Sequence, residues 1–148
     1  MRERRSSVEL RLSSCQGVKE NKIKLPKVID IKTCIARVKV QVVNRMDDKS
    51  SIIDLHCQSK DDDLGSVVLK VGNETEWSFS VNFLGTTLFY CDVKWSNSSS
   101  RYSFDAYDAV RDYTRCRTQC RWIISGQGSL YGYDQHHDIW VQFPLWKI

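Results

Sequence analysis

The chain has 148 residues, of which 41% are hydrophobic and 11% aromatic, with six Cys and a net charge of +4. This length suits a single domain, and the aromatic content argues against a disordered chain. Residues 1–36 carry nine Lys or Arg and four Asp or Glu, whereas residues 37–148 carry thirteen and fourteen. The second part is nearly neutral, which argues against a nucleic-acid-binding domain, because such a domain gathers positive charge on one face.

Residues 1–36 are polar, lack clean periodicity and contain Pro26. Within them, residues 1–24 never place more than two apolar residues in a row, so a secretion signal is not recognisable there. No segment of the chain approaches the ~18 apolar residues that span a bilayer. We therefore interpret residues 1–36 as a basic, poorly structured extension that folding does not require, and residues 37–148 as the domain.

From residue 37 onward, apolar and polar residues alternate with a period of two, which is typical of strands with one buried face. The alternation predicts nine short strands, at residues 37–43, 52–57, 66–70, 75–82, 86–95, 102–107, 120–124, 129–133 and 138–143. The fold class is therefore an all-β, antiparallel β-sandwich with turns between closely spaced strands. Shared parity on these strands places six aromatic residues in the core: Trp77, Phe79, Phe89, Trp95, Phe104 and Trp122.

Three consecutive carboxylates, Asp61, Asp62 and Asp63, stand before Leu64 and Gly65 in the connection after the second strand. Asp side chains accept hydrogen bonds from nearby backbone amides, and Gly allows the positive φ of a tight reversal. A Ca²⁺ loop needs alternating ligands and a distant bidentate Glu, which this segment lacks. We predict a turn in which one Asp accepts from the amide of Leu64 or Gly65, and no metal site.

The other candidates for chemistry are His56 and the run His136-His137-Asp138. Adjacent residues of a strand point to opposite faces, so His136 and His137 are badly placed to share a metal ion. The chain contains no Ser-His-Asp order, HExxH motif, P-loop or GxGxxG motif. We therefore expect no catalytic residues, no metal and no cofactor.

Four of the six cysteines lie in the neutral part, at Cys57, Cys91, Cys116 and Cys120, and it also contains two glycosylation sequons, at Asn73 and Asn97. A zinc site is disfavoured because Cys116 and Cys120 have no second close Cys or His pair opposite them. An even set of cysteines in a small β-rich domain indicates disulfides and an oxidising compartment. The other two cysteines, Cys15 and Cys34, belong to the extension.

Four blocks of the sequence carry a resemblance when they are taken in order: "VQVVNRM", "LHCQSKDDDLG", "WSFSVNFLGTTLFYCDVKW" and "RDYTRCRTQCRWIISGQGSLYGY". Residues 37 to about 143 resemble the plant self-incompatibility protein family, the S-protein homologues. The matching features are an Asn that ends the first strand, an HC-x-S-x-DDDLG block, a Trp- and Cys-containing strand pair, and a C-x3-C-x-W-x-I block. Residues 1–36 do not resemble the signal peptide of that family.

The resemblance implies a small, secreted, disulfide-bonded β-sandwich that acts without catalysis as a ligand of a cell-surface receptor. We expect a monomer that binds its receptor through loops, with 44–51, 58–64 and 96–101 as the main candidates because they combine charge with turn residues. No nucleic acid and no membrane span are expected for this function. The alternative is an intracellular interaction protein whose basic extension docks on nucleic acid or membrane.

Two disulfides among four cysteines allow three pairings. Cys116 with Cys120 would close a trivial loop and constrain the unfolded chain least, so this pairing ranks last. Parity does not decide between the other two pairings, since Cys57, Cys91 and Cys120 all point inward. We favour Cys57–Cys120 with Cys91–Cys116.

Overall fold

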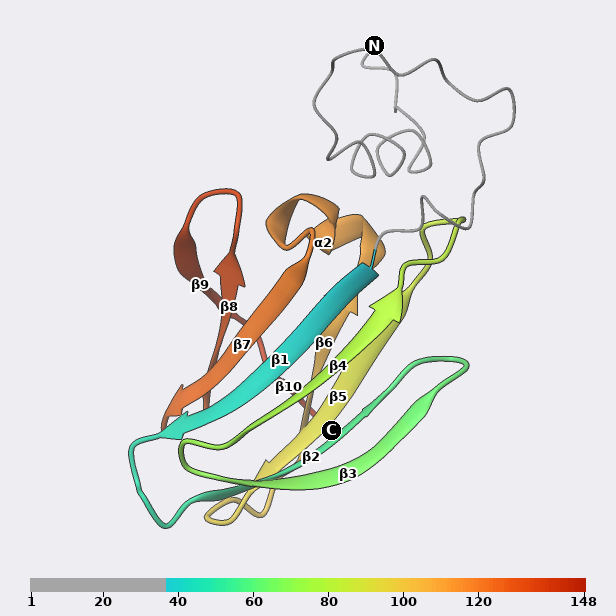
Figure 1. Ribbon diagram of the computed structural model, residues 1–148. Coiled ribbons are helices and arrows are strands. Elements are labelled where there is room, and N and C mark those ends of the chain that lie inside the picture. The colour runs from blue at the N-terminus through green and yellow to red at the C-terminus, as the bar shows by residue number, and fades with distance from the viewer. Residues whose placement is uncertain (1–36) are drawn as a thin grey trace, which may run out of the picture.

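A computed structural model describes residues 37–148, which form two five-stranded β-sheets packed face to face (Figure 1). Sheet A has the strand order β4-β1-β7-β8-β9, and sheet B has the order β10-β6-β5-β2-β3. The ten strands are β1 (Arg37–Met46), β2 (Ile52–Gln58), β3 (Asp63–Lys70), β4 (Glu74–Ser80), β5 (Leu88–Trp95), β6 (Tyr102–Asp108), β7 (Gln119–Gly126), β8 (Ser129–Asp134), β9 (Ile139–Phe143) and β10 (Trp146–Lys147). The all-β sandwich expected from the alternation is confirmed.

The neighbours of β1 depart from a purely antiparallel arrangement. Strand β1 pairs with β4 in antiparallel fashion on one side and with β7 in parallel fashion on the other. Every other strand pair of residues 37–148 is antiparallel. The expectation of an antiparallel sandwich is therefore wrong for this one pair, because alternation tells which face a residue takes and not which strand lies beside it.

A short helix, α2 (Ala109–Arg115), follows β6 and was not expected from the sequence. The Asp108 side chain caps it by accepting from the amides of Val110 and Arg111. The helix was missed because seven residues between two strands give little helical periodicity. At this length it falls far short of what a helix needs to cross a membrane, and it is the one helix that the structure describes.

The core lies between the sheets and consists of the inward residues of the alternating strands. Three of the expected core aromatics, Phe89, Phe104 and Trp122, are at most 3% exposed. The other three, Trp77, Phe79 and Trp95, are partly buried and pack against the margin of the core. The indole N–H of Trp122 in sheet A donates to the carbonyl of Ala106 in sheet B at 2.9 Å. This bond links the two layers through the core.

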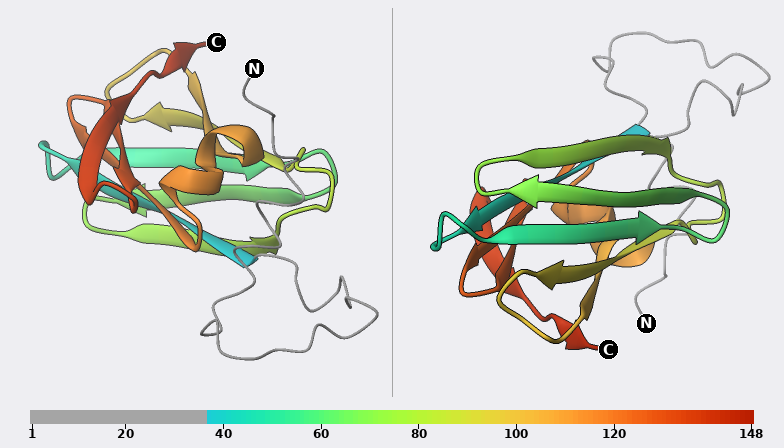
Figure 2. Two further views of the ribbon diagram at one scale, coloured as in Figure 1. Left: turned by 90° about the horizontal axis from the view of Figure 1, so that it is seen from above. Right: turned by 90° about the horizontal axis from the view of Figure 1, so that it is seen from below.

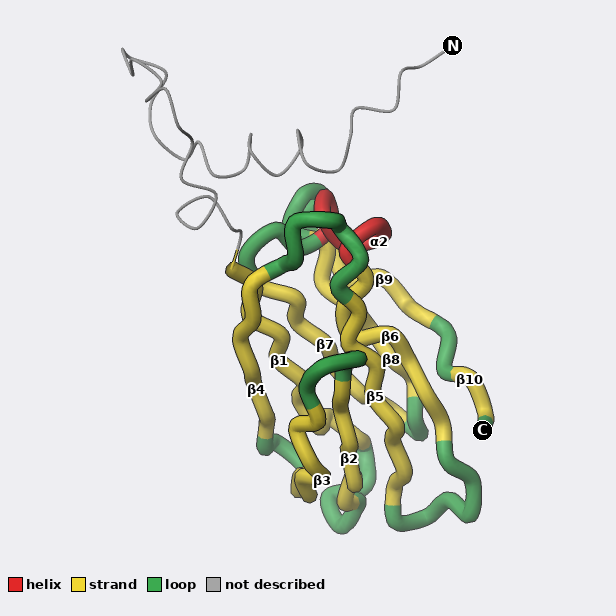
Figure 3. The backbone as a smooth tube through the Cα atoms, turned by 90° about the vertical axis from the view of Figure 1, so that its right-hand side faces the viewer, coloured by secondary structure: helices red, strands yellow, loops and turns green. Residues whose placement is uncertain are grey.

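The sandwich has two ends of different construction (Figure 3). At the helix end lie α2 and the connections β4–β5 and β8–β9, and the β2–β3 connection lies toward this end of its own strands but farther from α2 (Figure 3). At the turn end lie the connections β1–β2, β3–β4, β5–β6 and β7–β8. Both views of Figure 2 place the C-terminal strands β9 and β10, in red, along one side of the molecule.

Candidate recognition surface

The turn end brings together two of the loops that the sequence singled out. In the β1–β2 loop, Asp48 Oδ1 accepts from the amide and hydroxyl of Ser50. Its other oxygen, Oδ2, accepts from the side-chain amide of Asn97 in the β5–β6 loop at 3.3 Å. The two hydrogen bonds from Ser50 hold the pKa of Asp48 below its ordinary value of 3.8, and the hydrogen bond from Asn97 lowers this pKa by a smaller amount. The two loops therefore present one joint polar surface.

Beneath this surface, Asn44 fixes the start of the β1–β2 loop. Asn44 is fully buried, and its side-chain amide donates to the carbonyls of Leu69 at 2.9 Å and Ser51 at 3.3 Å. Its oxygen accepts from the amide of Met46. Because a buried polar group without partners costs free energy, this one side chain satisfies three backbone groups that a loop start would leave unpaired. Asn44, which lies within β1 two residues before its end, thus holds β1 against β3.

The third predicted loop lies at the opposite, helix end. There the Asp63 carboxylate accepts from the amide of Gly65 at 2.9 Å, as expected for a turn, and Gly65 has a positive φ of 73°. Asp62 closes the turn through its carbonyl, which accepts from the amide of Ser59 at 2.7 Å. Asp61 is exposed. The predicted loop bounds are too wide, because residues 44–46, 58 and 63–64 lie in β1, β2 and β3. The β1–β2 and β5–β6 loops share a surface, and the β2–β3 loop does not belong to it.

Asp63 also makes a contact that sequence reasoning missed. Its Oδ1 lies 2.6 Å from Nε2 of His56, across the β2–β3 pair on the outer face of sheet B. The hydrogen bond from His56, followed by that from the Gly65 amide, holds the pKa of Asp63 below 3.8. The sequence singled out His56, but its partner became visible only with the register of the strands.

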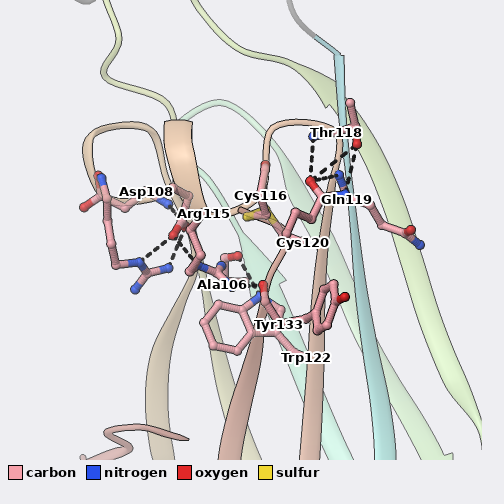
Figure 4. Close-up of a disulfide and its surroundings, with 12 residues drawn as sticks. Ala106, Asp108, Arg115, Cys116, Thr118, Gln119, Cys120, Trp122 and Tyr133 are labelled. Atoms are coloured by element: carbon pink, nitrogen blue, oxygen red, sulfur yellow. Dashed lines mark hydrogen bonds and ion pairs between the residues drawn. A yellow bond between two sulfur atoms is a disulfide. The ribbon is translucent and has the colours of Figure 1, made fainter. Parts of the chain in front are cut away.

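The disulfides of the described residues join Cys57 to Cys91 and Cys116 to Cys120, the second of which is drawn in Figure 4. The favoured pairing is therefore wrong, and the pairing ranked last is present. Cys57 and Cys91 are direct register partners on β2 and β5, with Cα atoms 4.0 Å apart. Cys116 is the C-cap of α2 and Cys120 is the second residue of β7, and the tight connection brings their Cα atoms to 5.0 Å. Loop entropy ranks disulfides by their effect on the unfolded chain, but native geometry decides which pairs form.

Next to the second disulfide lies a buried ion cluster around Asp112, whose side chain has no solvent exposure. Its two oxygens accept from Nε and Nη2 of Arg111, at 2.8 and 2.7 Å, and Oδ1 also accepts from Nε of Arg115 at 2.8 Å. Burial alone would raise the pKa of Asp112, but the hydrogen bonds from both arginines hold it below 3.8. Asp112 is therefore a structural carboxylate that stays ionised.

Arg115 connects this cluster to sheet A. Its Nη1 donates to the carbonyl of Tyr133 on β8, and its guanidinium lies 4.5 Å from the ring centroid of Trp122 (Figure 4). The space for this stack exists because residue 132 is Gly: a Cβ there would lie 2.8 Å from Trp122 and 2.9 Å from Arg115. The sequence signal that could have revealed this cluster is the spacing of Asp108, Asp112 and Arg115, which is typical of a capped helix.

One group of potential metal ligands occurs in the described residues, formed by Asp112, Cys116 and Cys120, whose ligand atoms lie within 4.8 Å of one another. The two sulfurs are bonded to each other, and the carboxylate is occupied by two guanidinium groups. Thiolates, not disulfide sulfurs, ligate metals. These three residues therefore stabilise the fold and do not form a metal site.

His136 and His137 lie in the β8–β9 connection, where both side chains are exposed and Asp134 accepts from both backbone amides. Nδ1 of His137 lies 2.9 Å from Asp134 Oδ2, and this hydrogen bond is the largest reason that the pKa of Asp134 lies below 3.8. Asp138 accepts from the hydroxyl of Tyr133. The run is a hydrogen-bonded turn.

Asn73 and Asn97, the two sequon residues, are both exposed at the turn end, and their glycosylation stays a prediction. Residues 1–36, with Cys15 and Cys34, lie outside the described residues, and so does the interpretation of that segment as an extension dispensable for folding.

With this geometry established, the chain can be compared with known proteins. Residues 39–146 match the model of the plant self-incompatibility protein S1 family. The chain belongs to this family. It is 40% identical over 111 residues to self-incompatibility protein S1 of Papaver rhoeas, with 74% of this chain and 78% of that protein covered. It is 36% identical over 109 residues to S-protein homolog 6 of Arabidopsis thaliana, with 74% of each chain covered.

A solved structure of a self-incompatibility protein homologue matches with a TM-score of 0.52 and 16% identity, covering 74% of this chain and 97% of that chain. At this identity the match supports the fold. That structure represents a widespread family of small, highly stable, secreted proteins from plants. The S-protein homologues described there are secreted proteins, and this chain belongs to the same family.

Proposed function

We propose that this protein is a secreted, non-catalytic signalling ligand that binds a receptor at the surface of a plant cell through the turn end of its sandwich. The observation that carries the proposal is the joint surface of the β1–β2 and β5–β6 loops, which Asp48 and Asn97 connect. Loops held on a rigid scaffold commonly carry recognition, because they can vary without disturbing the core. Similarity to self-incompatibility protein S1 supports a role in recognition between cells.

The non-catalytic part of the proposal rests on how the titratable groups are used. In the part of the chain that the structure describes, His56 and His137 are paired with Asp63 and Asp134 on separate surfaces. Neither ring is hydrogen-bonded to the side chain of a Ser, Thr or Cys there, as a base that activates a nucleophile would be. The buried Asp112 is saturated by arginines. These groups support the fold, and they are not arranged together as the residues of an active site would be.

The test is receptor binding by two loop-exchange variants of the full chain, produced in an oxidising host. The turn-end variant replaces residues 47–50 and 97–100, and it keeps the buried Ser51 and the Ser96 that bonds to Ile52. The helix-end variant replaces residues 59–62 as a matched control. Labelled protein is added to plasma-membrane vesicles from the tissues of the source plant.

We expect saturable binding by the parent chain and the helix-end variant, and loss of binding by the turn-end variant. Unchanged thermal unfolding of both variants shows that the scaffold is intact. Saturable binding that survives the turn-end exchange contradicts the loop assignment, and binding that never saturates contradicts the receptor itself.

A further inference from the structure

Strand β9 is one of the two edges of sheet A, and it differs from the other edge strands of residues 37–148. Strand β3 contains Asp63 and Lys70, β4 contains Glu74 and Glu76, and β10 contains Lys147, whereas β9 reads Ile-Trp-Val-Gln-Phe without a charge. Charged residues, Pro or bulges normally protect an edge against pairing with another chain. Strand β9 has none of these devices within its span.

The side chains of β9 are also unusually exposed. Ile139, Trp140 and Val141 are 51%, 39% and 36% exposed, and they are consecutive. Pairing with β8 assigns Ile139 and Val141 to the inner face of the sheet and Trp140 to the outer face. Ile139 and Val141 have inward parity but no strand covers them, since β9 lies at the margin of the sandwich (Figure 3). A run of this kind is typical of a surface that another molecule covers.

On the outer face, Trp140 belongs to a cluster that holds a positive charge. Cζ of Arg121 lies 5.2 Å from the ring centroid of Tyr133 and 5.3 Å from that of Trp140. The two rings are themselves 5.2 Å apart. Arg121 is exposed and forms no ion pair with an acidic residue of the described chain. Its guanidinium is thus held over the rings with its N–H groups available, and Arg, Tyr and Trp are the residues most often critical in protein interfaces.

We infer that the β9 edge binds an extended segment of a partner protein with an apolar–acidic–apolar sequence. The backbone of the segment would pair with the free edge of β9, as in other cases of strand addition. Because side chains alternate across a strand, the acidic residue opposite Trp140 would reach the guanidinium of Arg121 on the outer face. The two apolar neighbours would then cover Ile139 and Val141 on the inner face.

The position of the sequons is compatible with this surface. Asn73 precedes β4, which is the opposite edge of sheet A, and Asn97 lies in the β5–β6 loop of sheet B. Glycans at these residues would leave the β9 edge uncovered. The inference extends the proposed function by naming a second contact surface, but it does not depend on the turn-end loops.

The experiment uses the ¹⁵N-labelled full chain and three capped peptides: Ac-Thr-Val-Glu-Val-Thr-NH2, its Glu→Gln analogue, and Ac-Thr-Glu-Val-Glu-Thr-NH2. The third peptide carries more negative charge but the opposite parity. NMR titration reports the amides of β9 and the indole N–H of Trp140. We expect the first peptide to shift these signals and to bind about tenfold more tightly than the Gln analogue, since charge-assisted hydrogen bonds are the stronger ones.

Two variants test whether Arg121 is the positive charge that recognises the Glu of the peptide. Arg121→Gln should reduce the preference for Glu over Gln from about tenfold to about one, as in a double-mutant cycle. Arg45→Gln is the matched control, because Arg45 is exposed on the neighbouring β1 toward the turn end and should leave the preference unchanged. Unfolding curves of both variants exclude a loss of fold.

Equal binding of the Glu and Gln peptides, or equal binding of the peptide with opposite parity, overturns the inference. Pairing of β9 with a second copy of the chain at rising protein concentration, without peptide, also overturns it. These outcomes concern purified protein and peptides, so they leave the receptor-binding test of the turn end unaffected.

Discussion

The helix end and the turn end of the sandwich are held together by different kinds of interaction. Both disulfides of residues 37–148 lie toward the helix end, where the Asp112 cluster also joins α2 to β8. The turn end of the described chain is held by hydrogen bonds, chiefly those of Asn44, and by tight turns at Gly126 and Gly128. Covalent and ionic constraints are therefore concentrated at one end.

This difference fits our proposal that the turn end carries recognition and the helix end stabilises the fold. A recognition surface must vary in sequence without unfolding the protein, and loops that rest on a few backbone-directed hydrogen bonds allow this. The end that carries the disulfides and the buried ion cluster should tolerate fewer changes, because Asp112 and Arg115 each bond to more than one partner. The predictions below test whether the two ends differ in this way.

The largest effect is expected for Asp112→Ala at the helix end. The change leaves the partly buried guanidinium group of Arg111 and the buried one of Arg115 without their carboxylate, which costs about 3–5 kcal/mol of unfolding free energy. Denaturant unfolding of the oxidised protein measures it. Val110→Ala is the control, because Val110 is 72% exposed on the same helix and should change stability by less than about 0.5 kcal/mol. A loss no larger than that of the control would show that the cluster does not hold this end.

The two disulfides should contribute unequally. Cys57 and Cys91 are 34 residues apart and Cys116 and Cys120 are four apart, so the chain-entropy model assigns about 4 and about 2 kcal/mol to them. Two double variants, each replacing one pair by Ala, separate the contributions in equilibrium unfolding without reductant. Peptide mapping of the parent protein verifies the pairing first. A larger loss from the short loop would mean that native packing around Cys116 outweighs loop entropy.

The disulfides also show which structural features can be predicted from the sequence. Alternation placed Cys57 and Cys91 inward, and most strands followed from the same rule. Register between strands arises from long-range pairing, so neither the Cys57–Cys91 partnership nor the parallel contact of β1 with β7 was accessible. The Asp63 turn was local and was found. The Asp112 cluster was missed because a buried carboxylate between two arginines resembles an exposed charged helix in the sequence.

At the turn end, Gly128→Ala and Gly126→Ala form a matched pair. Gly128 has a φ of 114°, and a Cβ there would lie 2.5 Å from the Trp95 ring. Gly126 has a φ of 62° and no atom closer than 4.0 Å. We expect a loss of about 2–3 kcal/mol for Gly128→Ala, from strain and overpacking, and about 1 kcal/mol for Gly126→Ala. Thermal unfolding measures both, and equal losses would show that the Trp95 contact relaxes without cost.

The smallest effects concern two exposed carboxylates, Asp63 at the helix end and Asp48 at the turn end. Hydrogen bonds hold the pKa of each below 3.8: that of Asp63 through His56 and Gly65, and that of Asp48 mainly through Ser50. A carboxylate whose pKa is lowered on folding stabilises the protein fully above the unfolded value of 3.8, and this contribution is lost as the pH falls through the lowered folded value.

Asp63→Asn and Asp48→Asn should therefore lower the Tm at pH 6, and both differences from the parent should shrink as the pH approaches 3. Asp63→Asn should have the larger effect, because Asp63 joins β2 to β3 whereas the main partner of Asp48 is two residues away. Melting curves between pH 3 and pH 7 measure this. A Tm difference that grows in acid would contradict the lowered pKa, and a larger effect for Asp48→Asn would mean that its link to Asn97 stiffens the turn end more than we propose.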